Sequence, residues 1–407
     1  MRLRVALLAI TGAAFAATSA NAQQPTPGRG GGGGRGTTIG AGESCPPGSS
    51  EIRPRLCREP EFPAPSIVDY RPHSTLVTAE HKVPKAKYPA IDYHAHIQEF
   101  LRSAEALERL GPIIDSLGVK TMYAADVVSG DRLKTEVALV KASPTMKDRV
   151  RILTGINFNG VGPGWAEKAV KQLDDDIAAG AVGVGEIMKS FGTSIKKPDG
   201  SRLHIDDPEL DPIWEEAARL KIPVFIHTAD PQEFYEPLDY KNERWLEMAL
   251  FSDRRYPPDR YPRFEELMGE RDRLFKKHPK TTFVAAHFAW EANDLGRLAK
   301  LLTECPNVNV ELGAVLYDIG RQPRAAHDFF VQFQDRILFG KDSFQPEEYP
   351  YYWRVFETKD EYFDYYRGYH AFWKLYGIDL PDEVLKKVYY KNALRITPLA
   401  PHSGYPK

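Results

Sequence analysis

The sequence has no excess of charge of either sign: 54 lysines and arginines stand against 56 aspartates and glutamates, a formal net charge of −2 over 407 residues. This balance, without a basic run interleaved with aromatic residues, argues against a nucleic-acid partner. Beyond the N-terminus the sequence lacks a run of about 18 apolar residues, so it predicts no transmembrane helix. No Gly-x-Gly-x-x-Gly turn follows the first predicted strand, which argues against an open doubly wound sheet.

Cysteine is also scarce, with three residues in the whole chain. Cys45 and Cys57 lie close together in a segment rich in proline and arginine. In an oxidising compartment they can close a small disulfide loop, and two free thiols are the alternative. Cys305 has no such neighbour, and we expect it to be a buried structural thiol.

The N-terminus has the pattern of a secretory signal peptide. A basic start, Met1–Arg4, precedes an apolar run from Val5 to about Ala17, and Ala20-Asn21-Ala22 supplies a small-residue cleavage site before Gln23. The apolar part is too short for a stable membrane span. We therefore predict a signal peptide over residues 1–22 and an exported protein, periplasmic or extracellular.

The rest of the chain divides by composition into three parts. Residues 23–44 contain the run Gly30–Gly34 and few apolar residues, which predicts a flexible linker. Residues 45–87 hold many prolines and little periodicity, and we expect an extended arm. Residues 88–398 form the main domain, and a hydrophobic content of 42% supports a substantial core.

From Ala90 onwards, short β-prone apolar runs alternate with helical segments, a pattern typical of a parallel α/β sheet. The expected strands are Ala90–His94, Val119–Ala124, Val150–Phe158, Val182–Ile187, Pro223–His227, Thr281–His287, Asn307–Leu312 and Arg336–Gly340. The expected helices include Arg132–Lys141, Trp165–Ala178, Leu210–Leu220, Asn293–Leu302 and Arg324–Gln334. Eight units with no strand left over predict closure into a (β/α)₈ TIM barrel, with an open sheet as the alternative.

Two aromatic stretches extend the predicted barrel. His227 and His287 are 60 residues apart, roughly one βα unit plus a 30-residue excess that directly follows the fifth strand. We expect this insert to form a lid or pocket wall, and a subunit contact, as in a homodimer, is an equal alternative. The stretch Tyr349–Trp373 follows the eighth strand, where helix packing or a dimer contact is favoured over the lining of a pocket.

The first predicted strand ends in His94-Ala95-His96. Residues two apart on a strand point to the same face of the sheet. Both imidazoles therefore point to the same place, as two ligands of one metal ion must. Imidazole suits Zn, Fe and Ni and is tolerated by Mn. Two unrelated histidines near a strand end are the alternative interpretation.

Three later residues strengthen the metal interpretation. His227 and His287 end the fifth and sixth predicted strands, and Asp342 follows the eighth by two residues. These positions lie on the C-terminal face of a barrel, where its active sites form. One histidine at a strand end is more often a satisfied core residue, but the whole set would need a separate buried partner for each member.

Taken in order, these motifs resemble the amidohydrolase superfamily, most closely the amidohydrolase-related (amidohydrolase 2) branch of metal-dependent hydrolases, lactonases and non-oxidative decarboxylases. The resemblance covers residues 88–398. It depends on Asp92-Tyr93-His94-Ala95-His96, Ile226-His227-Thr228, Ala286-His287, Ile337-Leu338-Phe339-Gly340-Lys341-Asp342 and the closing stretch Tyr390-Lys391-Asn392-Ala393-Leu394-Arg395.

The resemblance implies that His94, His96, His227 and Asp342 bind a divalent metal ion, with Zn favoured and Mn or Fe as alternatives. His287 then stands beside the ion as an acid/base or carbonyl-polarising group. A bound ion lowers the pKa of water from 15.7 toward about 7. Asp342 can accept the released proton, and His287 can donate to the oxygen that gains charge.

Two positions depart from the usual pattern of that branch. The eighth strand reads Gly-Lys-Asp where Gly-Ser-Asp is common, and strand alternation predicts that Lys341 points away from Asp342. The fourth strand carries Glu186, at a place where some members of the superfamily bridge two ions. We favour a single ion, with Glu186 orienting a histidine.

The sequence as a whole predicts an exported, metal-dependent hydrolase of a small ester, lactone or amide. The first alternative is a decarboxylase of a small unsaturated or aromatic acid with the same ligands. The second is a non-catalytic, metal-containing binding protein, against which the presence of both His287 and Asp342 argues. The expected partner is a small-molecule substrate.

Overall fold

The computed structural model describes residues 36–406, which fall into two compact units that divide after Pro65. The predicted signal peptide and most of the predicted linker lie outside these described residues. Within the described part of the chain, no helix combines the length and the apolar character needed to cross a membrane.

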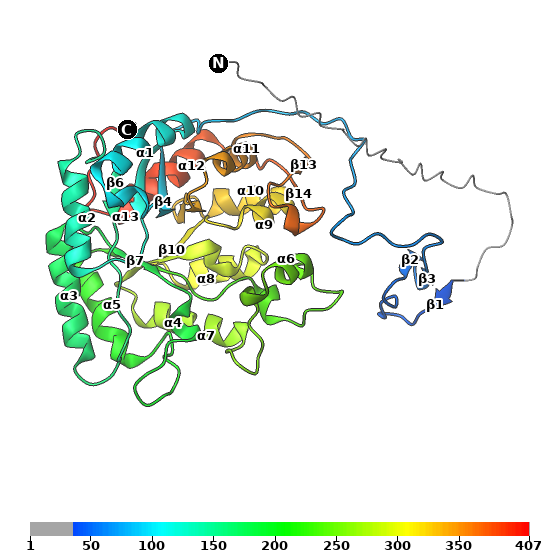
Figure 1. The fold of residues 1–407 in the computed structure, drawn as a ribbon, viewed down its shortest axis with the longest axis horizontal. Coiled ribbons are helices and arrows are strands. Elements are labelled where there is room, and N and C mark those ends of the chain that lie inside the picture. Colours follow the sequence, from blue (N-terminus) through cyan, green and yellow to red (C-terminus); the bar gives the residue numbers. More distant parts are fainter. Residues whose placement is uncertain (1–35, 407) are drawn as a thin grey trace, which may run out of the picture. The chain divides into compact units, whose positions relative to one another are not determined.

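The larger unit contains a closed ring of parallel strands. One sheet has the order β11-β10-β9-β8-β7 and the other the order β12-β4-β5-β6. A parallel bridge between Thr154 and Val184 joins β6 to β7, and β12 pairs with β4. Since β11 and β12 are two pieces of the eighth strand, the ring has eight strands and is the predicted (β/α)₈ barrel (Figure 1).

The barrel strands are β4 (Ala90–His96), β5 (Val119–Ala124), β6 (Val150–Ile152), β7 (Val184–Ile187), β8 (Pro223–Ile226), β9 (Thr282–Ala285), β10 (Val308–Glu311), β11 (Ile337–Leu338) and β12 (Asp342–Ser343). A hairpin of β13 (Phe363–Asp364) and β14 (Lys374–Leu375) follows them. All eight expected strands are present in the expected order.

The α-helices are α1 (Ala104–Leu117), α2 (Gly130–Ala142), α3 (Trp165–Ala179), α4 (Ser190–Thr193), α5 (Asp211–Leu220), α6 (Trp245–Leu250), α7 (Phe264–Lys277), α8 (Leu295–Glu304), α9 (Leu316–Arg321), α10 (Pro323–Gln332), α11 (Tyr349–Glu357), α12 (Asp382–Lys386) and α13 (Asn392–Ile396). Short 3₁₀ turns are η1 (Phe100–Arg102), η2 (Pro208–Leu210), η3 (Gln232–Tyr235), η4 (Ser252–Arg254), η5 (Ala286–Trp290), η6 (Pro346–Glu348) and η7 (Gly368–His370), and η8 (Lys387–Lys391) is a π-helix.

Local sequence explains where the helices around the barrel begin and end. The hydroxyl of Ser103 accepts a hydrogen bond from the Ala106 N–H (3.1 Å) and so caps the start of α1. The same helix ends at Gly118, whose φ of 78° suits glycine. The hydrophobic faces of these helices pack on strands that are themselves buried, such as β4, in which every residue before His96 is buried.

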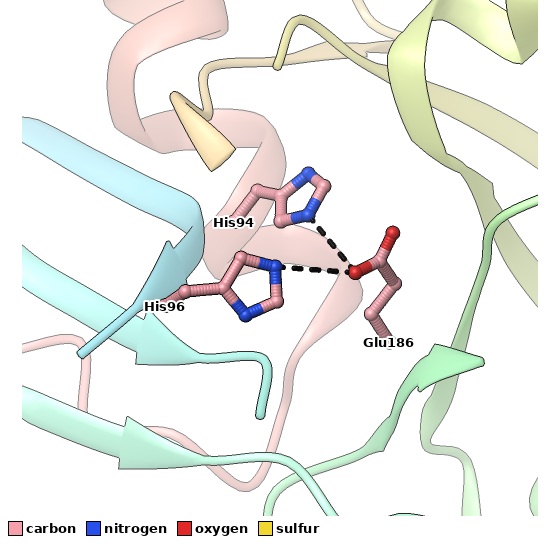
Figure 2. Close-up of side chains that lie close together, drawn as sticks. All are labelled: His94, His96 and Glu186. Carbon is pink, nitrogen blue, oxygen red and sulfur yellow. Dashed lines mark ion pairs between the residues drawn. The ribbon is translucent and has the colours of Figure 1, made fainter. Parts of the chain in front are cut away.

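The strands differ from their predicted lengths at the end where the barrel opens. The third strand stops at Ile152 rather than Phe158, and the sixth stops at Ala285 rather than His287. The eighth strand breaks at Gly340 and Lys341. The first strand instead runs on to His96, beyond its predicted end. His94 and His96 of β4 and Glu186 of β7 point toward one another (Figure 2).

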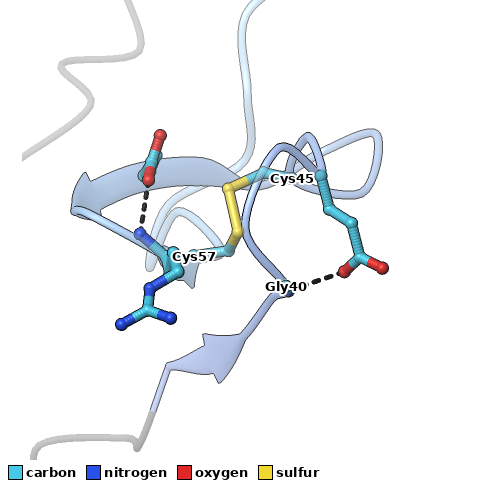
Figure 3. The surroundings of a disulfide bond; sticks show 6 residues. Gly40, Cys45 and Cys57 are labelled. Carbon is cyan, nitrogen blue, oxygen red and sulfur yellow. Dashed lines mark hydrogen bonds between the residues drawn. A yellow bond between two sulfur atoms is a disulfide. The ribbon is translucent and has the colours of Figure 1, made fainter.

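The smaller unit, described from residue 36 to 65, is an antiparallel sheet of β1 (Thr37–Thr38), β2 (Ser50–Arg53) and β3 (Leu56–Arg58) in the order β1-β3-β2. The Cys45–Cys57 disulfide closes it and confirms the predicted pairing (Figure 3). A disulfide that closes a loop of this size contributes roughly 3 kcal/mol. Cys305 of the larger unit is a buried free thiol, as expected.

Candidate metal centre

His94 and His96 point to the same spot inside the mouth of the barrel. Their Nε2 atoms lie 3.2 Å and 3.3 Å from one oxygen of Glu186, Oε2 (Figure 2). Asp342 Oδ1 approaches the same two nitrogens, at 3.8 Å from His94 and 3.4 Å from His96. Two predicted ligands from β4, one from β7 and one from the eighth strand thus converge.

The opposite ring nitrogens of the two histidines decide which atoms carry protons. His94 Nδ1 lies 2.9 Å from Glu311 Oε2, and His96 Nδ1 lies 3.1 Å from Asp126 Oδ1. An ionised carboxylate only accepts hydrogen bonds, so each Nδ1 is assigned as the N–H donor. In the neutral form of each imidazole, Nε2 then carries the lone pair and faces the carboxylate oxygens of Glu186 and Asp342.

Ligand atoms of His94, His96 and Glu186 lie within 4.8 Å of one another, as metal ligands do, and Asp342 approaches both histidines. Four ligands at about 2.0–2.1 Å from a tetrahedral ion lie roughly 3.3–3.4 Å from one another, and the four distances between His94 or His96 and the two carboxylates are 3.2, 3.3, 3.4 and 3.8 Å. His94 Nε2 is buried and has no hydrogen-bond partner among the described residues. Lone pairs that face each other in a buried place repel unless a cation lies between them.

Burial and charge act in opposite directions on the pKa values of the centre. Burial lowers the pKa of His94, but Glu186 and Glu311 outweigh this effect and raise it well above its usual value. Burial likewise lowers the pKa of His96, which Asp126 and Glu186 raise to about 9. Burial raises the pKa of Glu186, whereas the neighbouring histidines hold it well below its ordinary value. Without a metal ion these shifts favour protonated imidazoles paired with carboxylates, and a metal ion binds in competition with these protons.

His227 reaches the centre through Nδ1, which lies 2.6 Å from the second oxygen of Glu186, Oε1. The indole N–H of Trp290 donates to His227 Nε2 (3.2 Å), so Nδ1 carries the proton in this arrangement. Asp230 Oδ1 lies 3.7 Å from the same Nε2. For Nδ1 to bind a metal ion, its proton has to move to Nε2, where Asp230 can accept a hydrogen bond from it.

His287 is buried beside His227, with its Nε2 atom 3.2 Å from His227 Nδ1. Its own Nδ1 donates to the Gly313 carbonyl (2.8 Å), so Nε2 presents a lone pair and is poised to accept a proton. In this state His287 is a proton acceptor, and it becomes the donor expected from the sequence only after protonation.

The backbone that carries His287 is strained. All four residues of the segment His287–Trp290 have φ between 52° and 58°, the left-handed region, which costs roughly 1–2 kcal/mol per residue. The buried guanidinium of Arg271 supports the turn by donating to the Ala289 carbonyl (2.7 Å) and to Glu291 (2.8 Å). The turn ends β9 early and places the His287 ring on the barrel axis.

Asp92 connects the first and eighth strands next to the ligands. It accepts hydrogen bonds from the backbone N–H groups of His94 (3.0 Å) and Lys341 (3.1 Å) and from the Tyr349 hydroxyl (2.5 Å). Burial raises the pKa of Asp92 to about 6, although Tyr349 lowers it. The Lys341 ammonium pairs with Glu348, so it points away from Asp342, as strand alternation predicted.

Sequence reasoning missed Glu311, Asp126 and Asp230. Glu311 is a fully buried charge in a predicted strand, which was a usable signal because such residues are rarely buried unless paired. A Cβ at Gly340 would overlap Glu311 Oε1 and lie 2.8 Å from His94 Cβ, which explains the glycine at that position. Asp126 and Asp230 lie in loops, and no spacing marks them.

The insert after the fifth strand packs on the segment that follows the eighth. Phe234, Met248 and Tyr256 form a small core of their own within the insert. The buried Arg244 donates to Glu247 (2.9 Å), and Glu247 in turn lies 3.0 Å from His370 Nε2 of η7. These contacts hold α6 against η7, whereas the role of the insert as a lid or a subunit contact stays a prediction.

A cavity of about 290 Å³ borders Glu186 on the side of the third and fourth strands. Val127, Phe158 and Met188 contribute apolar surface to it, and Asn157 contributes an amide. Glu186 is the only charged residue that lines it. Uncharged parts of a small substrate fit this environment next to the candidate metal centre.

Residues 91–399 match the family model described as Amidohydrolase. The match spans more than half of the chain, so this protein belongs to the amidohydrolase family, as its motifs predicted. Members of this family are metal-dependent enzymes. None of the curated proteins matches the chain.

Solved structures share the fold at low identity. A dihydroxybenzoic acid decarboxylase from Polaromonas sp. JS666, with bound manganese, is 15% identical over 77% of this chain and 97% of its own, with a TM-score of 0.44. A 5-carboxyvanillate decarboxylase from Sphingomonas paucimobilis is 13% identical over 77% and 99%, with a TM-score of 0.42. A 4-oxalomesaconate hydratase from Rhodopseudomonas palustris is 15% identical over 76% and 96%, with a TM-score of 0.44. At these scores the similarities do not bear on the reaction.

Proposed function

We propose that this protein is a metal-dependent hydrolase of a small ester, lactone or amide. One observation supports it above the others: the Nε2 atoms of His94 and His96 and the carboxylate oxygens of Glu186 and Asp342 converge at 3.2–3.8 Å, so that the neutral imidazoles and the carboxylates together offer four ligand atoms to one cation. Such an acceptor-rich centre at the C-terminal face of a barrel suits a divalent cation and a water nucleophile.

In this proposal His94, His96, Asp342 and Glu186 Oε2 hold one ion, with Zn favoured and Mn or Fe as alternatives. His227 joins them once its Nδ1 proton has moved to Nε2. A bound ion supplies Lewis acidity and lowers the pKa of water toward about 7. Glu186 thus acts as a ligand through one oxygen and orients His227 through the other.

The proton steps fall to two side chains. Asp342, held in a left-handed backbone conformation (φ 78°), accepts a proton from the attacking water. Burial raises the pKa of Asp342, but His94, His287 and His96 outweigh burial and lower it, so the carboxylate is ionised and ready to accept. Asp342 then passes this proton to the leaving group, and His287, once protonated from solvent at Nε2, donates to the oxygen that gains charge.

We also propose that the protein is exported. The N-terminal pattern of residues 1–22 supports this, and the Cys45–Cys57 disulfide suits an oxidising compartment. Expression of the full chain with and without residues 1–22, followed by fractionation, tests the proposal. Retention of the full chain inside the cell would contradict it.

Metal analysis of the purified protein followed by a substrate panel tests the reaction. We expect one equivalent of a transition metal and turnover of lactones, esters or amides that stops on chelation. Two equivalents would indicate a second ion shared by His227 and His287. Release of carbon dioxide from carboxylated aromatics without hydrolysis would identify a decarboxylase, and a metal-loaded protein without turnover would identify a binding protein.

A further inference from the structure

Arg367 differs from the other arginines of its region in having no carboxylate partner. Arg244, Arg321 and Arg354 each pair with at least one acidic side chain, at distances of 2.7–3.2 Å. The guanidinium of Arg367 makes no ion pair within residues 36–406, and its neighbours there are tyrosines. It lies between β13 and η7, in a segment that follows the eighth strand and therefore belongs to the active face of the barrel.

The tyrosines around Arg367 also have unused hydrogen-bonding groups. The hydroxyls of Tyr365 and Tyr366 are buried, lie close to each other, and have no hydrogen-bond partner among the other described residues. Their rings lie 4.4 Å apart, and the Tyr366 ring centre is 5.7 Å from the Arg367 guanidinium carbon. A buried hydroxyl without a partner costs about 1–3 kcal/mol, so a place that gathers two of them beside a free cation is expensive unless a ligand satisfies it.

All three groups can donate. Burial raises the pKa of Tyr365 well above its ordinary value, so the hydroxyl keeps its proton. Burial lowers the pKa of Arg367, but the surrounding tyrosines outweigh it and raise the pKa, so the guanidinium keeps its charge. The Arg367 guanidinium with two hydroxyl donors beside it suits a planar anion such as a carboxylate, because a carboxylate has two oxygens with several lone pairs that accept hydrogen bonds.

Two links tie this donor cluster to the candidate metal centre. Tyr352, which also neighbours Arg367, accepts a hydrogen bond from the Ala314 N–H (3.2 Å). The preceding residue, Gly313, supplies the carbonyl that holds His287 Nδ1 (2.8 Å). On the other side, His370 of η7 contacts Glu247 of the insert (3.0 Å). The donor cluster therefore lies where the loop after β10, the segment after the eighth strand and the insert meet.

We propose that Arg367, with the hydroxyls of Tyr365 and Tyr366, binds a carboxylate group of the substrate. The substrate is then a small organic acid whose ester, lactone or amide bond reaches the metal ligands. The reaction at that bond depends on the proposed function, whereas the binding of a carboxylate by Arg367 does not.

The first experiment measures binding without turnover. Protein stripped of metal with a chelator is titrated by calorimetry with benzoate and with benzamide, which has the same ring and no charge. We expect benzoate to bind the wild type at least ten-fold more tightly than benzamide. Arg367→Gln should weaken benzoate at least ten-fold and leave benzamide unchanged, as the loss of a charge-assisted donor predicts.

Matched variants separate binding from folding. Arg255→Gln, at an exposed arginine of the insert, should leave benzoate binding unchanged. Arg367→Lys keeps the charge and should restore part of the affinity. If Arg367→Gln does not fold, as judged by its circular dichroism, the double variant Tyr365→Phe/Tyr366→Phe removes two donors at constant ring volume and should weaken benzoate several-fold. Equal benzoate affinity in the wild type and the folded variants would overturn the proposal.

A second experiment applies once a hydrolysed substrate is known. With an acidic substrate, Arg367→Gln should raise KM about ten-fold and change kcat little, whereas the methyl ester of the same acid group should react alike with both proteins. Equal KM values for the acid in both proteins would contradict the carboxylate site. Failure of every hydrolysis assay would contradict the proposed function and leave the calorimetric result standing.

Discussion

Arg244 and His94 are both buried on the active side of the barrel. Arg244 is a hydrogen-bond donor surrounded by acceptors, whereas the Nε2 atom of neutral His94 is an acceptor surrounded by other acceptors. Arg244 donates to Glu233 (3.2 Å) and Glu247 (2.9 Å) and stacks over Tyr317, with 4.4 Å between the guanidinium carbon and the ring centre. His94 offers a lone pair that meets only the carboxylate oxygens of Glu186 and Asp342. Within the described residues Arg244 is paired with acidic side chains, whereas the acceptors around His94 suit a cation.

This contrast distinguishes buried polar groups that stabilise the fold from buried polar groups that are suited to bind a ligand. A buried charge that is fully paired holds two segments together, and removing one partner costs about 3–5 kcal/mol. A cluster in which acceptors face acceptors is unfavourable by itself and gains from any cation that binds. The Arg367 cluster is the reverse case, because within residues 36–406 its guanidinium and the two hydroxyls have no carboxylate acceptor.

The largest expected effect comes from removing the acceptors themselves. The double variant His94→Ala/His96→Ala takes away two of the proposed ligands, and solvent does not replace them at equal strength. We expect metal content near zero and loss of essentially all turnover, measured by elemental analysis and by assay. His402→Ala, at an exposed histidine, is the matched control and should retain both. Full metal occupancy in the double variant would refute the ligand assignment.

His287→Asn separates proton transfer from metal binding, because it removes a proton acceptor and leaves the proposed ligands in place. We expect turnover to fall by about 10²-fold or more, the usual scale for a general acid/base, with the metal content unchanged. Both quantities are measured on the same preparation. If metal and turnover fall together, His287 is a ligand and the centre holds two ions.

Glu311→Gln tests a smaller effect, on the orientation of a ligand. The glutamine keeps the volume of Glu311 but loses the charge that holds the Nδ1–H of His94 (2.9 Å). Loss of such a partner weakens metal affinity by roughly 10–100-fold. Competition with a chromogenic chelator measures it, with Glu304→Gln on the exposed side of α8 as the control. Unchanged affinity would restrict Glu311 to a packing role.

The smallest expected effect concerns the cluster of Arg244, Glu247 and His370, which joins the insert to η7. His370 and Arg244 outweigh burial and lower the pKa of Glu247 to about 2, and burial lowers that of His370 to about 4. Both pKa values lie below those of the same groups in the unfolded chain, so the two groups contribute their full stabilisation near neutral pH. The contribution of His370 is lost as the pH falls from about 6 to about 4, and that of Glu247 is lost at lower pH.

Melting of metal-free protein between pH 7 and pH 4 measures this loss. We expect Tm of the wild type to fall by about 1–2 °C more than Tm of Glu247→Gln, because an unfolding entropy of about 2.1 cal/mol/K per residue converts a loss of about 1 kcal/mol into roughly 1–2 °C for the larger unit, Ser66–Lys407. At neutral pH the variant should bind metal normally. An identical pH dependence in both proteins would show that the cluster does not contribute to the acid response.

Much of the fold and part of the candidate centre could be predicted from the sequence. The alternation of apolar runs and helices predicted eight strands in their observed order, and period-two alternation predicted that His94 and His96 share a face. The ends of the strands were predicted less well. The sixth strand stops before His287 because a left-handed turn begins there, and apolar composition does not encode that turn.

The sequence by itself determined the barrel and the residue types gathered at the strand ends, because these depend on local periodicity and composition, and it indicated that Cys45 and Cys57 can pair. The three-stranded sheet around that disulfide was not expected, since residues 45–87 were predicted to be an extended arm. Only the tertiary structure decided which carboxylates complete the centre. Glu311 is 217 residues from His94 in sequence, and no repeating pattern relates the two. Whether a buried charge finds a partner is likewise a property of packing, which is why Arg244 is paired and Arg367 is not.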